Sequence, residues 1–93
     1  MLDLQQLQTF RVVALTNSFN RAAAELGYSQ PSVTFHIQSL ERELGATLFT
    51  RHRLSRGATL TEAGRHALAF ADKLFGLVQE AKATLGHERT EVG

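Results

Sequence analysis

The sequence has no cysteine, no tryptophan, a single proline and no long apolar run. Without cysteine the chain forms no disulfide, and a zinc site would need histidine and carboxylate ligands alone. A membrane-spanning helix needs roughly 18 consecutive apolar residues, and no segment comes near that length. The N-terminus also lacks the basic region and apolar stretch of a secretory signal. We therefore expect a cytoplasmic protein without membrane contact, in which 93 residues form one compact domain.

The chain also has little net charge, and only one segment is clearly basic. The formal net charge is only +1, which is a weak sign of nucleic-acid binding. However, Arg51, Arg53 and Arg56 lie within six residues that contain no acidic side chain. Residues 61–93, by contrast, carry four basic and five acidic side chains. The basic segment is either a solvated loop or a contact for phosphate groups.

Patterns that support catalysis are missing as well. The histidines, His36, His52, His66 and His87, do not have the spacing of metal ligands. The sequence has no G-x-S-x-G motif, no P-loop and no cysteine nucleophile. We expect a protein that is not an enzyme and holds no metal or cofactor. We expect His36 to be solvated or near a phosphate.

The first half of the sequence predicts three short helices, over about 3–16, 18–26 and 29–44. A residue that can cap a helix stands at the start of each, namely Asp3, Ser18 and Ser29. Gly27 and Gly45 end the second and third helices. The apolar stripe of the first helix consists of Leu4, Leu7, Phe10, Val13 and Ala14. Two helices joined across a glycine turn form a helix-turn-helix pattern, although such pairs also occur in other all-helical domains.

The third predicted helix carries an aromatic residue away from its apolar face. The apolar stripe consists of Val33, Ile37, Leu40 and Leu44. At about 100° per residue, Phe35 falls on the opposite side. That side also carries Pro31, Gln38 and Arg42. The Phe35 ring is either covered by a binding partner or leans sideways onto the first helix or the following segment.

The second half predicts a hairpin and one long helix. Residues 47–50 and 58–61 are β-prone and flank the arginine-rich turn. The helix is expected over about 61–86, followed by a frayed polar tail over 87–93. Its main apolar stripe consists of Ala67, Phe70, Leu74, Leu77, Val78, Ala81 and Leu85, and Leu68 and Phe75 point in a second direction. The candidates for a dimer interface are the members from Phe70 onward. One surface can cover the body of the domain, and the other predicts a second copy of the chain. The alternative is that both surfaces pack within one chain.

Several short motifs occur in a fixed order between residues 18 and 64. They are "SF..AA" in the second predicted helix, "SQP.V" and "LE.ELG" at the two ends of the third, and "LF.R" and "LT.AG" on either side of the arginine-rich turn. Taken together, they are highly specific. Over roughly residues 3–66 the sequence resembles the N-terminal DNA-binding domain of LysR-type bacterial transcriptional regulators, and the long helix is similar to the linker helix of that family.

The resemblance implies a mainly α fold with a clear division of the chain. Residues 1–60 would form a winged helix-turn-helix, with the helix-turn-helix over about 18–44 and the wing over about 47–61. Residues 61–86 would form the linker and dimerisation helix. The implied partners are double-stranded operator DNA and a second copy of the chain, with a tetramer as an alternative for the full-length protein. Full-length members add a C-terminal domain that binds a small-molecule effector, so this chain is expected to be a fragment.

A winged helix-turn-helix places its third helix in the major groove of DNA. On that basis the base-reading candidates are Gln30, Pro31, Thr34, Phe35 and Gln38. The candidates for backbone or wing contacts are Asn20, Ser29, Ser32, Arg42, Arg53 and Arg56. The family commonly carries a polar or basic residue where this chain has Phe35, so reading of guanine by arginine is not expected there. The alternative function is a winged helix that associates with another protein and does not bind DNA.

Overall fold

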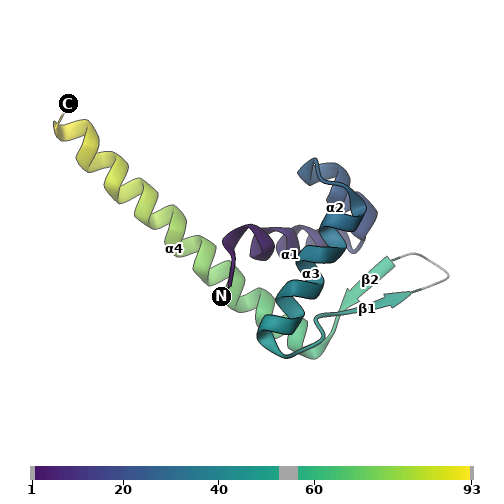
Figure 1. The fold of residues 1–93 in the computed structure, drawn as a ribbon. Helices are drawn as coiled ribbons and strands as arrows, with labels where there is room; N and C mark the ends of the chain where they lie inside the picture. Colours follow the sequence, from purple (N-terminus) through teal and green to yellow (C-terminus); the bar gives the residue numbers. More distant parts are fainter. Residues whose placement is uncertain (1, 53–56, 93) are drawn as a thin grey trace.

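The computed structural model describes residues 2–52 and 57–92, and within these ranges the chain forms four helices and one two-stranded sheet (Figure 1). In chain order the elements are α1 (Leu4–Thr16), α2 (Phe19–Leu26), α3 (Gln30–Leu44), β1 (Phe49–His52), β2 (Gly57–Leu60) and α4 (Glu62–Val92). Helices α1, α2 and α3 pack against one another, and α4 runs along α1 and continues beyond it (Figure 1). The predicted fold, three helices with a two-stranded wing and a long C-terminal helix, is confirmed.

Side chains close the N-termini of the first three helices. Oxygen atoms of Asp3, Ser18 and Ser29 accept hydrogen bonds from the backbone N–H groups of Gln5, Arg21 and Ser32, respectively. At the opposite ends, Asn17, Gly27 and Gly45 adopt left-handed backbone angles, with φ of 55°, 72° and 69°. Glycine adopts this conformation without strain and asparagine tolerates it. The predicted starts and ends of these helices are therefore confirmed.

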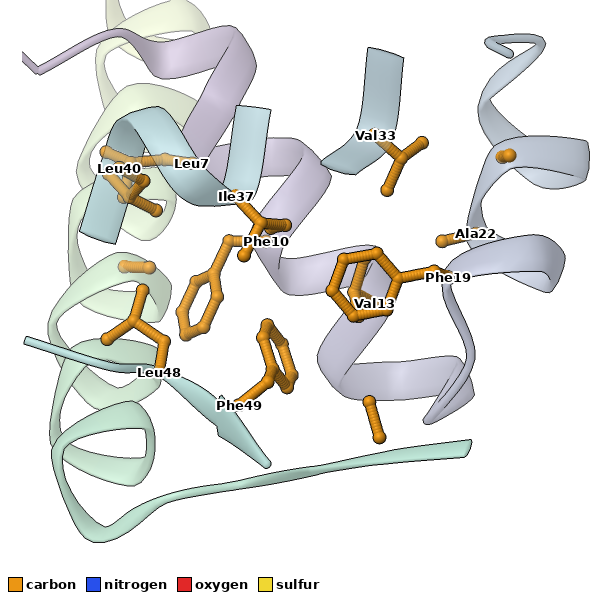
Figure 2. Close-up of a cluster of buried hydrophobic side chains, with 13 residues drawn as sticks. Leu7, Phe10, Val13, Phe19, Ala22, Val33, Ile37, Leu40, Leu48 and Phe49 are labelled. Atoms are coloured by element: carbon orange, nitrogen blue, oxygen red, sulfur yellow. The ribbon is translucent and has the colours of Figure 1, made fainter. Parts of the chain in front are cut away.

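The core lies between the first three helices and β1 (Figure 2). Three aromatic rings meet there. The ring centroids of Phe10 and Phe49 are 5.5 Å apart, and those of Phe19 and Phe49 are 5.7 Å apart. The enclosed aliphatic side chains around them include Val13, Val33, Leu40 and Leu48. Burying side chains of this size stabilises a fold by about 1.5–3 kcal/mol each, so the cluster holds α3 firmly against α1 and β1.

Two residues that the helical spacing assigns to the core lie at the surface. Leu4 is 49% exposed and Leu44 is 42% exposed. Leu4 is the first residue of α1, and Leu44 is the last residue of α3. The spacing within one helix does not show how far the neighbouring elements reach, and for these two residues the core prediction is wrong.

The hairpin begins two residues later than the sequence predicts. β1 and β2 are antiparallel, with Phe49 opposite Leu60. The backbone of Leu48 is bound elsewhere, because its N–H donates to Glu41 Oε2 at 2.7 Å and its carbonyl accepts from the Thr61 N–H at 3.0 Å. These two bonds fasten the base of the hairpin to the end of α3 and to the residue before α4.

Helix α4 packs one side against α1 and projects past it. The side chains that meet the core are Ala67, Leu68, Ala71 and Phe75. Beside them, Arg11 Nε donates to Asp72 Oδ1 at 2.9 Å, and the guanidinium lies 4.6 Å from the centroid of the Phe75 ring. The 31 residues of α4 span about 46 Å at 1.5 Å per residue.

Helix α4 ends at Val92, not near residues 85–86 as the sequence suggests. Residues 62–92 contain no proline. A glycine inside a helix costs only about 1 kcal/mol, so Gly86 does not force an end. The segment expected to be a frayed tail is therefore helical through Val92. Within residues 2–52 and 57–92, none of the helices combines the length and apolar character needed to pass through a bilayer.

Candidate nucleic-acid interface

One face of α3 points away from the core. Gln30, Pro31, Phe35 and Gln38 are exposed on it, and Thr34 is half-buried. At 100° per residue these side chains fall within roughly 140° of the helix circumference. Phe35 is 58% exposed, and its ring lies beside His36 with the centroids 6.4 Å apart. The structure therefore gathers the predicted base-reading residues on one accessible surface.

A basic side chain from the wing reaches this face. Arg51 Nη2 donates to Thr34 Oγ1 at 3.2 Å, and Gln30 Nε2 donates to the same oxygen at 3.3 Å. The Arg51 guanidinium also lies 3.7 Å from the centroid of the Phe19 ring. The sequence prediction did not include Arg51 among the site residues. Its place two residues after the buried Phe49, on the same side of a strand, is the signal that could have identified it.

Small polar residues surround the turn between α2 and α3. Ser29 Oγ accepts from the Ser32 N–H at 3.2 Å and donates to Ser32 Oγ at 2.9 Å. Asn20 is exposed in the first turn of α2. Arg42 is also exposed, but it lies twelve residues after Gln30, about 18 Å along α3. The two serines therefore adjoin the N-terminal part of α3, whereas Arg42 belongs to its other end.

His36 faces inward, which corrects the expectation of a solvated or phosphate-bound ring. Its Nδ1 is 2.9 Å from Oγ1 of the fully buried Thr9, and its ring meets the edge of Tyr28 with centroids 5.4 Å apart. Tyr28 in turn accepts a hydrogen bond from Gln5 Nε2 at 2.7 Å. His36 thus belongs to the packing between α1 and α3.

Two predicted wing contacts, Arg53 and Arg56, lie outside the described residues. On the described part of the wing, His52 Nε2 is 3.0 Å from Thr59 Oγ1 across the two strands. The acidic Glu41 is half-buried, and its Oε2 accepts a hydrogen bond from the Leu48 N–H at the base of the hairpin.

The predicted dimer stripe lies on the outer side of α4. Phe70 is 70% exposed, Leu77 62% and Leu85 63%. Leu74 and Ala81 are also exposed, and Val78 is half-buried. Near the body, the stripe continues into an apolar groove of about 320 Å³ whose lining includes Leu2, Leu44, Phe70 and Leu74. So many large apolar side chains on one surface indicate an interaction site.

Comparison with protein families identifies this arrangement. Residues 4–65 match the family described as "Bacterial regulatory helix-turn-helix protein, lysR family". A similar curated protein is the uncharacterized HTH-type transcriptional regulator YusT of Bacillus subtilis (strain 168), which is 47% identical over 84 residues. That match covers 90% of this chain and 28% of the relative. The chain thus spans less than a third of the relative, which is named as a regulator and not as an enzyme.

Two solved structures match nearly the whole chain. The crystal structure of the BenM_DBD/catB site 1 DNA complex has a TM-score of 0.89 and 30% sequence identity, and the match covers 99% of this chain and 97% of that one. The crystal structure of the CbnR_DBD-DNA complex has a TM-score of 0.83 and 33% identity, with coverage of 99% and 100%. Both of those proteins are in complex with DNA.

Proposed function

We propose that this chain, which belongs to the lysR family of bacterial regulatory helix-turn-helix proteins, binds double-stranded DNA in a sequence-specific manner. The observation that carries the proposal is the accessible face of α3, where an exposed aromatic ring lies among polar side chains. The similar BenM and CbnR domains in complex with DNA support it. The relatives are more than three times as long as the chain. We therefore assign DNA binding to this chain and effector binding to a part of the protein outside it.

In this proposal the N-terminal half of α3 enters the major groove. The base-reading residues are Gln30, Pro31, Thr34, Phe35 and Gln38. Phe35 makes no strong hydrogen bond, so it discriminates by apolar contact with the C5-methyl group of thymine. A glutamine side chain can pair with N6 and N7 of adenine, which gives Gln30 or Gln38 the complementary polar role.

Contacts to phosphate fix the register of the protein on the duplex and carry no sequence information. We assign them to Asn20, Ser29, Ser32 and Arg42 in the helices and to Arg53 and Arg56 in the wing. Each cation that meets a phosphate should contribute to the salt dependence of binding.

We further propose that two copies associate through the outer stripe of α4. Burial of Phe70, Leu74, Leu77 and Leu85 against a second copy would remove their exposed apolar surface from water. A two-fold axis relating the copies would present two α3 helices to the DNA, and this arrangement demands an inverted-repeat operator.

A mobility-shift titration of the 93-residue chain tests the proposal. The probes are duplexes that the chain selects from a random pool, and shuffled duplexes of the same composition. We expect a shift at low salt for both probes, and at about 150 mM salt a strong preference for the selected probes. Absence of any shift at low salt would favour the alternative, a winged helix used only for association with proteins.

A further inference from the structure

We propose that Arg51 is a positioning residue for base reading, which holds the wing and the hydroxyl of Thr34 in fixed relation to α3. This inference rests on the proposed DNA-binding function. Arg51 contacts two elements at once, because its guanidinium lies over the Phe19 ring of α2 and donates to Thr34 Oγ1 of α3. It thereby joins β1 to both helices of the helix-turn-helix.

The position of Arg51 follows from the alternation of a strand. Phe49 and Arg51 lie on the same side of β1, and the residues between and after them point to the other side. Phe49 is buried against Phe19 and Phe10, whose rings gather between α1, α2 and β1 (Figure 2). Arg51 therefore extends from the edge of the core toward α3, where its planar group covers the face of Phe19.

Phe19 gives the guanidinium a rigid support. Only 7% of Phe19 is exposed, and its ring is fixed by the edge-on contact with Phe49. A planar guanidinium can stack on an aromatic face and donate a hydrogen bond in its own plane at the same time. A lysine ammonium has no plane to stack, so it cannot reproduce both contacts.

The Thr34 hydroxyl is the group that this geometry controls. Its oxygen accepts from Arg51 at 3.2 Å and from Gln30 at 3.3 Å, which engages both lone pairs. Toward DNA the hydroxyl can then act only as a donor. The acceptors that the major groove offers are N7 and O6 of guanine, N7 of adenine and O4 of thymine. Arg51 therefore selects which base edges Thr34 can recognise.

The competing role for Arg51 is a direct contact with phosphate. A lost phosphate contact weakens binding to every sequence alike and lowers the salt slope of binding by about 0.9. A lost positioning contact weakens binding to the correct sequence and leaves the salt slope unchanged. Lysine replaces arginine well as a point charge on a phosphate and poorly at a stacked site, so Arg51→Lys separates the two roles.

The experiment compares the wild-type chain with Arg51→Lys and Arg51→Gln, using the duplex that the wild type selects and a shuffled duplex. Both affinities are measured over a range of KCl concentrations. We expect Arg51→Lys to weaken binding to the selected duplex by about tenfold, the size of one mismatched base pair. Binding to the shuffled duplex should change by less than about twofold, with the salt slope unchanged. Arg65→Lys, on the exposed first turns of α4, is the matched control and should change neither affinity.

A loss of stability does not imitate this result, since the ratio of the two affinities does not depend on the folded fraction. In a chain that already carries Thr34→Val, Arg51→Lys should weaken binding to the selected duplex by less than about twofold more, because the two residues act through one hydroxyl. The inference is overturned if Arg51→Lys binds both duplexes as the wild type does. It is also overturned if Arg51→Gln weakens binding to both duplexes equally and Arg51→Lys restores it. If the wild type itself does not distinguish the duplexes, the proposed function fails, and the inference fails with it.

Discussion

Nδ1 of His36 lies 2.9 Å from Oγ1 of Thr9, and this contact joins α3 to the buried side of α1. The Thr9 oxygen also lies 3.1 Å from the backbone carbonyl of Gln5, one turn earlier in α1. Helix α3 is thus held by a polar contact next to its exposed face. Phe35, the neighbouring residue, is left on the outside.

Thr9→Val should lower the free energy of unfolding by about 1–3 kcal/mol, because it leaves Nδ1 of the half-buried His36 without its hydrogen-bond partner. Valine keeps the side-chain volume, so the variant removes the polar contact without opening a cavity. Urea denaturation measures the change. Thr50→Val is the control, since Thr50 is exposed on the wing and its replacement should stay within about 0.5 kcal/mol of wild type. Equal stabilities of the two variants would show that the contact between Thr9 and His36 contributes nothing to the fold.

Gly64→Ala should destabilise the chain by about 1–3 kcal/mol. A Cβ at this position would overlap the carbonyl oxygen of Leu48, which already accepts from Thr61 and cannot move freely. Gly76→Ala, also in α4, is the matched control: apart from its chain neighbours and the backbone of α4 itself, no atom of residues 2–52 and 57–92 lies within 4 Å of an added Cβ there, and the variant should gain about 0.5–1 kcal/mol from reduced backbone entropy. Thermal unfolding compares the two. A Gly64→Ala variant as stable as Gly76→Ala would refute the close approach of α4 to the base of the wing.

These features differ in how far the sequence reveals them. The caps of the first three helices are visible because capping is a local property of a few neighbouring residues. The sequence does not reveal that Leu4 and Leu44 are exposed, or that His36 turns inward. These features depend on where other elements end and on partners distant in the chain. Periodicity within one helix carries no such information.

The same distinction applies to the candidate site. The exposed face of α3 follows from helical spacing, since Phe35 lies opposite the stripe that contains Ile37. Arg51 was predicted only as part of a basic run. Its contact with Thr34 joins residues seventeen positions apart and exists only once β1 is placed beside α3.

The double variant Leu77→Lys/Leu85→Lys should be monomeric, because two buried charges on the outer stripe of α4 would oppose association. It should also bind DNA weakly and lose any preference for half-site spacing. Gln79→Lys/Ala83→Lys adds the same charge on another side of α4 and should remain dimeric. Sedimentation equilibrium measures the mass. A dimer for the first variant would contradict the assignment of the stripe.

Phe35→Ala should leave thermal stability nearly unchanged, since the side chain is 58% exposed. It should weaken binding to the selected duplex by about 1–3 kcal/mol, the range for one base contact. Replacing the contacted thymine by uracil removes only the methyl group, and it should imitate that loss in the wild type and add nothing in the variant. A marked fall in melting temperature, with no effect of uracil at any position, would identify the ring as structural.

The central claim is that the exposed face of α3 reads DNA sequence, and the ratio of affinities for selected and shuffled duplexes tests it most directly. At about 150 mM salt we expect a ratio of at least about 10³ for the wild type. In Phe35→Ala/Gln38→Ala the ratio should fall by roughly 10- to 100-fold, while affinity for the shuffled duplex stays unchanged. The control Leu15→Ala/Gln79→Ala removes one apolar and one glutamine side chain from exposed positions on α1 and α4 and should keep the wild-type ratio. An undiminished ratio in Phe35→Ala/Gln38→Ala would contradict the claim.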